Sequence, residues 1–574
     1  MDGIHGLHPT TKVRRYLEAG YWTNETIDGV FREQVRTRGD SPAIVDPTNR
    51  PSLVGSTPRR MSWTELDTEV TRTAAWLLER GIGRGDVIGM QLPNGIELVQ
   101  TYLAAWTIGA VVSPLAMQYR EHEVVTMADK AGCTALVTCH RFGDRRPAAE
   151  ALAVRERIPS LHHVVAFGDP TERPPDAPEG VLDLAPAAAT EEDRQRVDAY
   201  RAAHPNDPND CVTIAWTSGT ESEPKGVLRA HYDWLCFAWA TIEAPKVTTD
   251  DVLLNMFPMI NMAGICGMLL PWLRTGSTLV QHHPFDPATL FDQLVQERVT
   301  YTLAPPTLLW RLLNDEELLG TVDLSNLTRL GSGSVPLQVP MVRGWQERFG
   351  IGVINFFGSN EGIGLLSNTD DFPDPQLRAQ YFPNYGHTDR EWSSRSSKWT
   401  RVRLVDVETG KEVTEPGHSG ELRIAGPMLF AGYLDHESLP DAFDEDGFLK
   451  TGEIFEIAGE NGEFLHYLDR TKDLIIRGGM NIAPAELESL ILDHPSIAEV
   501  AVIGDPDETM GERVASIVVL HPGTQLSLDE LVAWLRNKHI ASFKLPERLD
   551  IRPALPRNPV GKLLKRELRI PTGG

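Results

Sequence analysis

Cysteine is scarce in this sequence, and no two cysteines stand at close spacing. The chain has five cysteines in 574 residues, and none belongs to a Cys-x-x-Cys pair. Disulfide frameworks and cysteine-rich metal sites need such organised spacing, so we expect neither. The prediction is five buried thiols in a reducing environment.

An excess of positive charge is also missing. Lysine and arginine number 55 against 80 acidic residues, which gives a formal net charge of −25. A chain with this charge repels polyanions, so a general nucleic-acid binder or a protein of anionic membrane surfaces is excluded. Any phosphate-bearing ligand must therefore be bound by local donors.

No membrane-spanning segment is expected. Residues 98–119 are uncharged over 22 positions, but glutamine, glycine, serine and proline interrupt them. This composition predicts a buried helix, a turn and a strand. The first residues include charges and prolines and lack the apolar core of a signal peptide, so a cytoplasmic protein is predicted.

What the sequence does contain is an alternation of strands and helices. Ser62 and Glu65 form a capping-box pattern before an amphipathic helix, a strand follows over 86–92, and a second helix begins at Ile96. Such alternation indicates a layered α/β fold with much parallel sheet. Residues 142–210, rich in proline and charge, are interpreted as a surface excursion, and 366–400 resemble loops.

The pattern changes near residues 469–473. Beyond them we predict three strands and two helices: strands over 474–476, 500–503 and 514–520, and helices opening at Pro484 and after Ser527. This is a compact α+β unit of about 100 residues, an ordinary domain size.

The most informative segment is the loop at residues 216–226, Trp-Thr-Ser-Gly-Thr-Glu-Ser-Glu-Pro-Lys-Gly, which follows a β-branched run. Hydroxyl groups, two glycines and Lys225 together offer donors and a cation to a phosphate. The loop is not a Walker A motif, because Pro224 replaces the second glycine and no serine or threonine follows the lysine.

Four further features accompany this loop. Residues 356–362 join a strand end to Glu361, residues 450–453 end in Glu453, Arg470 stands at the domain joint, and Lys562 follows a glycine near the C-terminus. Taken singly, each has an ordinary structural explanation: a surface loop, a strand-end carboxylate, a surface ion pair or a solvated lysine.

In this order and spacing the segments resemble the adenylate-forming superfamily of acyl-CoA synthetases, aryl-acid ligases, luciferases and peptide-synthetase adenylation domains. The motifs are most similar to those of stand-alone acyl-CoA ligases. The resemblance implies a large N-terminal multi-layer α/β domain (1–469), a hinge (470–472) and a small mobile C-terminal α+β domain (473–574). It implies an ATP-dependent, AMP-forming acid–thiol ligase that makes an acyl-adenylate and pyrophosphate, then transfers the acyl group to a thiol.

The resemblance also implies roles for single residues. The ATP phosphates would be bound by Thr217, Ser218, Gly219, Thr220 and Lys225. A second ATP-binding segment would comprise Phe357, Gly358, Ser359, Asn360 and Glu361. Within these segments, Phe357 would stack on adenine, and Glu361 with Thr220 would hold Mg²⁺. Gly333 and Ser334 would line the adenine and acyl pocket, and Glu453 with Arg470 would bind the ribose.

Two lysines of the second domain complete this assignment. Lys472 would be the hinge, and Lys562 would be the catalytic lysine of adenylation alongside Glu361. The chemistry requires positive charge, because a carboxylate must approach a polyphosphate; Mg²⁺ and a lysine neutralise the developing charge. A lysine on a mobile domain can withdraw before the thiol arrives.

Several positions depart from the superfamily pattern. Glu221 and Ser222 replace the usual threonine and glycine, Asn360 replaces threonine, and Glu453 replaces aspartate. Asn261, expected beside the acyl group, replaces a histidine common in acyl-CoA and aryl-acid ligases. It cannot accept a proton, so thiol transfer is less firmly indicated than adenylation, although family drift explains it equally well.

The thiol tunnel matches CoA-using members at Gly478 and Gly479, where glycine lets backbone approach a pantetheine arm. We therefore predict an apolar or aromatic acid as substrate and CoA as acceptor. Three alternatives stay open: loading of a separate carrier protein, adenylation of nitrite to diazotise an aromatic amine in secondary metabolism, and a catalytically silent nucleotide-binding protein. Retention of Lys562, Glu361 and Arg470 argues against the last.

Overall fold

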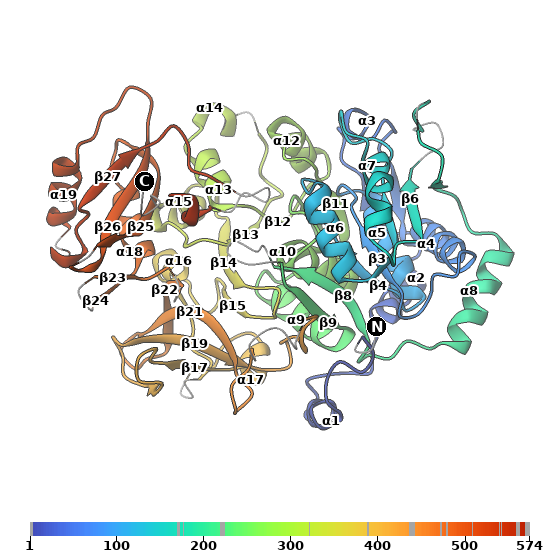
Figure 1. The fold of residues 1–574 in the computed structure, drawn as a ribbon, viewed down its shortest axis with the longest axis horizontal. Coiled ribbons are helices and arrows are strands. Elements are labelled where there is room, and N and C mark those ends of the chain that lie inside the picture. The colour runs from blue at the N-terminus through green and yellow to red at the C-terminus, as the bar shows by residue number, and fades with distance from the viewer. Residues whose placement is uncertain are drawn as a thin grey trace.

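In the computed structural model, the strands of the described residues form four sheets (Figure 1). The described residues are 4–168, 173–175, 177–217, 224–320, 322–386, 390–435, 442–470, 473–477, 480–507, 509–538, 540, 542–557 and 563–568. Three sheets belong to the large N-terminal domain. The fourth belongs to the small C-terminal domain, which lies at one end of the molecule in Figure 1.

The first eight-stranded sheet includes the strands on either side of the predicted phosphate loop, β8 and β9. Its order is β20-β9-β8-β4-β3-β5-β6-β7. The strands are β3 (Val87–Met90), β4 (Val111–Pro114), β5 (Cys133–Thr138), β6 (His163–Phe167), β7 (Val181–Leu184), β8 (Cys211–Trp216), β9 (Gly226–Ala230) and β20 (Gly432–Tyr433). Strands β3 to β8 are parallel, whereas β9 and β20 add antiparallel pairs at one edge.

The second eight-stranded sheet has the order β15-β14-β13-β12-β10-β11-β1-β2. Its strands are β1 (Pro42–Val45), β2 (Arg60–Ser62), β10 (Val252–Asn255), β11 (Thr278–Gln281), β12 (Tyr301–Leu303), β13 (Arg329–Gly333), β14 (Gly352–Gly358) and β15 (Gly364–Ser367). Only the two edge strands, β2 and β15, run antiparallel to their neighbours. Parallel sheets of this kind need helices on their faces.

A six-stranded antiparallel sheet completes the large domain, in the order β16-β22-β21-β19-β17-β18. Its strands are β16 (Tyr381–Pro383), β17 (Arg401–Val405), β18 (Glu412–Val413), β19 (Ser419–Ala425), β21 (Leu449–Ala458) and β22 (Phe464–Arg470). The small domain holds a sheet of β23 (Ile475–Arg477), β24 (Met480–Ile482), β25 (Ile497–Asp507), β26 (Gly511–Leu520) and β27 (Arg548–Ile551). Its apolar core is separate from those of the large domain.

The helices follow the strand alternation predicted from the sequence. In the first half of the chain they are α1 (Thr10–Glu18), α2 (Ile27–Arg38), α3 (Arg50–Leu53), α4 (Trp63–Leu78), α5 (Ile96–Thr107), α6 (Glu121–Lys130), α7 (Pro147–Val154), α8 (Glu191–Ala203), α9 (His231–Glu243), α10 (Met262–Gly264) and α11 (Leu270–Thr275). The rest are α12 (Pro287–Gln296), α13 (Pro306–Leu313), α14 (Glu316–Leu319), α15 (Val339–Phe349), α16 (Pro375–Gln380), α17 (Ser396–Trp399), α18 (Pro484–Leu492) and α19 (Leu528–Asn537). None of them, within the described residues, is long and apolar enough to span a membrane.

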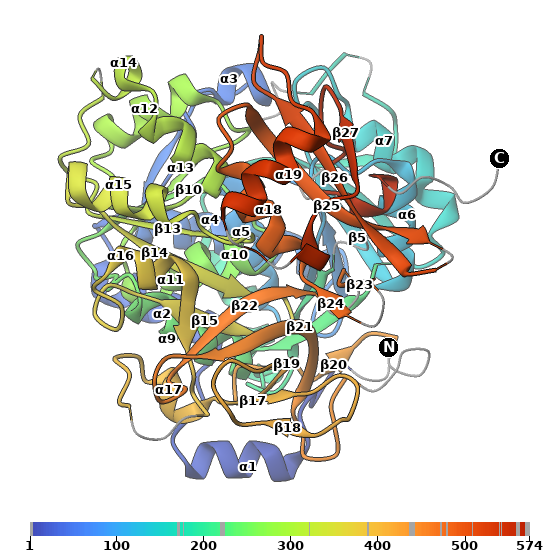
Figure 2. The same cartoon turned by 90° about the vertical axis from the view of Figure 1, so that its left-hand side faces the viewer.

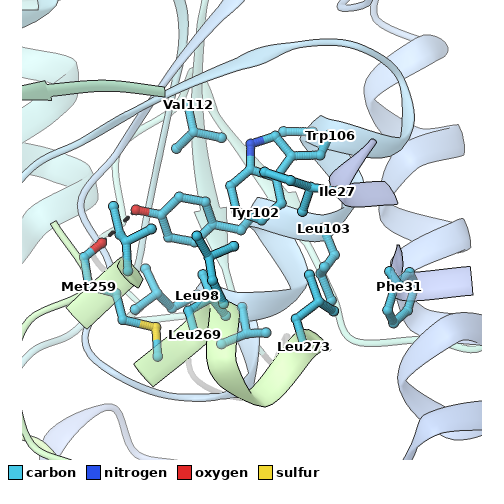
Figure 3. Close-up of a cluster of buried hydrophobic side chains, with 14 of the residues drawn as sticks. Ile27, Phe31, Leu98, Tyr102, Leu103, Trp106, Val112, Met259, Leu269 and Leu273 are labelled. Carbon is cyan, nitrogen blue, oxygen red and sulfur yellow. Dashed lines mark hydrogen bonds between the residues drawn. The ribbon is translucent and has the colours of Figure 1, made fainter. Parts of the chain in front are cut away.

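Several sequence predictions are confirmed. The Ser62–Glu65 capping box opens α4, residues 98–119 contain most of α5 followed by β4, and all five cysteines are buried and free. Around α5 the largest apolar core joins residues of both eight-stranded sheets with residues of α2, α4, α9 and α11. Figure 3 shows part of this core, where Tyr102 of α5 points its hydroxyl at the carbonyl of Met259.

Two predictions of surface structure were wrong. Residues 142–210 contribute β6 and β7 to the first sheet, and residues 366–400 include α16 and β16. These strands are short. β6 pairs with β5 and β7, whereas β16 pairs with the distant β22, as when Phe382 pairs with Leu465. Local composition, dominated by polar residues between the strands, therefore concealed them.

The Tyr102 hydroxyl should stabilise the fold measurably. Both Tyr102 and Met259 are buried, and the hydroxyl lies 2.5 Å from the Met259 carbonyl oxygen. We expect Tyr102→Phe to lower the free energy of unfolding by about 1 to 2 kcal/mol, because a buried acceptor loses its donor. Chemical denaturation would measure it.

Tyr301 supplies the matched control. It is also fully buried, but its hydroxyl has no hydrogen-bond partner among the described residues. Tyr301→Phe should therefore leave stability unchanged or raise it. Equal losses in the two variants would show that the Tyr102 hydrogen bond contributes nothing specific.

Candidate active site

The base of the predicted phosphate loop is held by paired backbone. Strand β8 ends at Trp216, which pairs with Gly226 at the start of β9. The Thr217 N–H donates to the Lys225 carbonyl at 3.0 Å, and the Lys225 N–H donates to the Thr217 hydroxyl at 3.2 Å. Thr217 and Lys225, two of the predicted phosphate ligands, therefore lie close together at the base of the loop. The others, Ser218, Gly219 and Thr220, lie outside the described residues, as does the variant pair Glu221 and Ser222.

Lys225 and Glu361 meet at Tyr433. The Tyr433 hydroxyl donates to a Glu361 carboxylate oxygen at 3.0 Å, and the Lys225 ammonium lies 5.2 Å from the centre of the Tyr433 ring. Burial, with the neighbouring Glu361 charge, raises the pKa of Tyr433, so its hydroxyl stays protonated. Sequence reasoning missed Tyr433, because it stands in a two-residue strand that pairs with the distant β9.

Asn360 connects three parts of the site. Its side-chain amide donates to the Trp216 carbonyl at 3.0 Å, and its side-chain oxygen accepts the Met262 N–H at 2.9 Å. The end of β8 and the start of α10 are therefore fixed relative to the Glu361 loop. The sequence interpretation placed Asn360 in the second ATP-binding segment, and these two structural bonds are additional.

Asn261 is the N-cap of α10. Its side-chain oxygen accepts the N–H groups of Ala263 and Gly264, at 3.1 and 3.4 Å. Asparagine is among the best residues for this position, which gives a structural reason for Asn261. Gly264 is required here, because a Cβ atom would lie 2.4 Å from the Pro258 carbonyl oxygen.

The strand β13 delivers Gly333 and Ser334 beside β14. A Cβ atom on Gly333 would lie 2.1 Å from the Phe356 carbonyl oxygen, so only glycine fits. Ser334 is exposed and has a φ of +73°, which serine rarely adopts. Strained residues of this kind concentrate at ligand sites, which favours a functional role for this turn.

The three residues predicted to bind adenosine lie together around Tyr467. Its ring is 5.6 Å from that of Phe357. Glu453 and Arg470 are register partners on β21 and β22, and their side chains form an ion pair at 3.2 Å. Burial, together with the charge of Glu453, raises the pKa of Tyr467. Tyr467 was another residue that local sequence did not reveal.

The joint between the domains is held by Asp469, the residue before Arg470. One carboxylate oxygen accepts the Arg470 N–H at 2.7 Å, and the other accepts the Ala485 N–H in α18 at 2.8 Å. Burial raises the pKa of Asp469 to about 6. The predicted hinge Lys472, the tunnel residues Gly478 and Gly479, and the catalytic Lys562 lie outside the described residues.

Residues 31–434 match the family described as AMP-binding enzyme, and residues 486–562 match the AMP-binding enzyme C-terminal domain. The chain belongs to the AMP-binding enzyme family. It is therefore an ATP-dependent, AMP-forming ligase with the adenylate-forming fold, and the predicted superfamily is confirmed.

Relatives match over nearly the whole AMP-binding chain. The medium-chain fatty-acid–CoA ligase of Escherichia coli is 30% identical and covers 96% of this chain and 92% of its own length. The salicyl-AMP ligase / salicyl-S-ArCP synthetase of Mycobacterium tuberculosis is 29% identical, with coverages of 98% and 94%. The ATP-bound crystal structure of MatB from Rhodopseudomonas palustris superposes with a TM-score of 0.75 at 25% identity, covering 95% of this chain and 98% of its own.

The capping role of Asn261 can be separated from a chemical role. Asn261→Ala should lower the free energy of unfolding by about 1 kcal/mol, whereas Asn261→Asp should keep most of the stability, because aspartate caps equally well. Thermal unfolding would measure both variants. Asn49, which precedes α3 without a capping hydrogen bond, is the matched control, and Asn49→Ala should cost less. A loss in Asn261→Asp as large as in Asn261→Ala would contradict the assignment.

Proposed function

We propose that this AMP-binding enzyme joins an apolar or aromatic carboxylic acid to CoA in two half-reactions. In the first, a carboxylate oxygen attacks the α-phosphorus of ATP, and the bond to pyrophosphate breaks. In the second, the CoA sulfur attacks the acyl carbon, AMP leaves, and the thiol proton is lost to solvent. The observation that carries the proposal is the grouping of Lys225, Glu361 and Tyr433 beside the loop at 217–225.

We assign the site residues the following roles. Thr217 and Lys225 bind the polyphosphate at the loop mouth, and Lys562 supplies positive charge during adenylation. Phe357, Glu453 and Arg470 hold adenosine around Tyr467, where an aromatic face and hydrogen-bonding groups are grouped. Gly358, Ser359 and Asn360 set the path of the backbone to Glu361. These assignments rest on the family resemblance together with the contacts of the described residues.

The residues present fit Mg²⁺. No cluster of three His, Cys, Asp or Glu that could hold a metal occurs in the described parts of the chain, and Mg²⁺ needs none. This ion is commonly held by one or two carboxylates plus substrate phosphates, so the single carboxylate of Glu361 suits it. When bound, Mg²⁺ would neutralise phosphate charge. Tyr433 donates to one Glu361 oxygen and so fixes how the carboxylate is presented.

An apolar acid is supported by three apolar residues that we place around it, Trp234, Phe237 and Met259. Trp234, Phe237 and Met259 are buried, and the indole N–H of Trp234 is already bonded to the Thr213 hydroxyl at 2.7 Å. A pocket formed from them therefore offers apolar surface and few free polar groups, which selects against small polar acids.

A separate carrier protein is the second candidate acceptor. It is supported by the similarity to the salicyl-S-ArCP synthetase over 98% of this chain. Nitrite in place of the acid remains a further alternative, and the same assay decides it. Pyrophosphate release shows whether an acid or nitrite is adenylated, and CoA consumption shows whether CoA is the acceptor. An acid that supports pyrophosphate release without CoA consumption favours a carrier protein, and release with nitrite alone favours the diazotising activity.

The Glu361 carboxylate tests the first half-reaction. We expect Glu361→Gln to lower pyrophosphate release by about two orders of magnitude or more and to change its Mg²⁺ dependence, because a neutral amide binds the ion poorly. Glu297, buried and paired with Arg60 at 2.6 Å, is the control carboxylate, and Glu297→Gln should keep the parental rate. Parental activity and Mg²⁺ dependence in Glu361→Gln would assign Glu361 a structural role.

The proposed hinge tests the second half-reaction. Lys472→Pro should leave adenylation measurable and suppress thioester formation, because proline fixes φ and restricts rotation between domain orientations. Pyrophosphate release and CoA consumption measure the two steps separately. Equal loss of both would make the joint merely structural. Pyrophosphate release from nitrite alone, with no CoA consumption for any acid, would replace the proposal with the diazotising activity.

A further inference from the structure

A buried chain of three side chains lies behind the Glu361 loop. His8 contacts Asp233 through its Nε2 atom at 3.1 Å, and Asp233 accepts from the Arg229 Nε–H at 2.6 Å. His8 is 2% exposed, and the other two residues are fully buried. None of the three has a role in the proposed function.

The Arg229 guanidinium joins two distant backbone segments. One terminal nitrogen donates to the Asn360 carbonyl at 2.8 Å, and the other donates to the Met428 carbonyl at 2.9 Å. The planar fork of arginine suits such a multiple contact, which a lysine ammonium cannot reproduce. Asn360 immediately precedes Glu361, so the arginine acts directly on the backbone that carries the carboxylate.

The two segments held by Arg229 are in close contact. A Cβ atom on Gly362 would lie 2.1 Å from the Met428 carbonyl oxygen, and the Phe430 N–H donates to the Glu361 carbonyl at 2.9 Å. Glu361 is therefore fixed between Arg229 on one side and residues 428–430 on the other.

The N-terminal segment contacts the backbone next to Met428. We call residues 8–22 the N-terminal strap; it contains α1, which lies at the lower end of the molecule in Figures 1 and 2. The Trp22 indole N–H donates to the Pro427 carbonyl at 3.0 Å, and its ring stacks on Tyr232 at 4.5 Å. The strap precedes residue 31, where the family match begins.

The charges in this chain balance internally. Burial alone would raise the pKa of Asp233, but the Arg229 charge and the His8 hydrogen bond outweigh it, so the pKa is lowered. Burial lowers the pKa of His8, which therefore donates as a neutral imidazole. Removing one partner of a buried ion pair strongly lowers stability, because the other charge is left without compensation.

We propose that Arg229, Asp233 and the N-terminal strap position Glu361 and hold its carboxylate where metal-bound ATP needs it. The inference rests on the proposed role of Glu361. It predicts that weakening the contacts among His8, Asp233 and Arg229 loosens the Glu361 loop in the ligand-free protein. The same change should weaken Mg²⁺-dependent ATP binding, although these side chains contact neither Mg²⁺ nor ATP.

Two graded variants test the proposal. Arg229→Lys keeps the charge but loses the fork, and Trp22→Phe keeps an aromatic ring, though a smaller one, and loses the N–H donor. We expect faster amide exchange at Phe430 in both ligand-free variants. We also expect the Mg²⁺ concentration for half-maximal ATP binding, measured by calorimetry, to rise about tenfold or more in Arg229→Lys, the usual scale for losing a partner of a metal ligand.

His8 provides a rescue pair if Arg229→Lys fails to fold. His8→Leu removes the donor to Asp233, whereas His8→Gln keeps an N–H donor and should restore near-parental exchange and binding. Arg378 is the matched control: it is fully buried and donates to the carbonyls of Val353 and Phe372. Arg378→Lys should lower thermal stability without changing the Mg²⁺ dependence.

The outcomes separate the two proposals. If the parent binds ATP without any Mg²⁺ dependence, the proposed role of Glu361 is wrong, and the positioning role falls with it. If the parent depends on Mg²⁺ but the folded Arg229→Lys, Trp22→Phe and His8→Leu proteins match it in exchange and binding, the positioning role alone is overturned. The same change in Arg378→Lys would also overturn it, because any buried arginine would then suffice.

Discussion

The side chain of Asn360 is the contact on which the arrangement of the site depends. It donates to the carbonyl at the end of β8, accepts the N–H at the start of α10, and stands beside Glu361 on the chain. One carboxamide thus joins two eight-stranded sheets at the place where their strands end. Backbone groups at such ends must find partners, because unpaired polar groups are costly once buried. Satisfying them with a single short side chain fixes the end of β8, the start of α10 and the backbone before Glu361 relative to one another.

Two positive side chains lie near this contact in a protein whose net charge is strongly negative. A chain of net charge −25 must bind a polyanion, so the positive charge has to be local. Lys225 lies at the loop mouth over Tyr433, and Arg229 is buried behind the Glu361 loop with its charge matched by Asp233. Lys225 and Arg229 therefore have different roles. Lys225 is available to a ligand, whereas Arg229 is committed to backbone carbonyls and holds the loop in place.

At the joint between the domains, a single side chain again bonds two backbone segments. Asp469 bonds the backbone of Arg470 and the first turn of α18, while Lys565 forms an ion pair with Glu488 of that helix at 2.8 Å. An acidic group near a helix N-terminus is favourable because of the exposed N–H groups there. These contacts link the end of β22 to the small domain.

The sequence by itself determined the family, the order of the motifs and most of the regular structure. The Ser62–Glu65 cap and the buried helix at α5 depend on neighbours within a few residues, so local chemistry identifies them. The loop at 216–226 and Glu361 were singled out by the order of the motifs, and their roles stay predictions. Only the tertiary structure decided what surrounds them. Arg229 meets Asn360 and Met428 across 131 and 199 positions, and Tyr433 meets Glu361 across 72. The strands β6 and β7 pair with each other and with β5 nearby in the chain, and the polar residues around them concealed them. The strand β16 was missed for the same reason as Tyr433: its partner β22 is remote in sequence, and no local pattern records which distant partner a short strand or a buried charge will find.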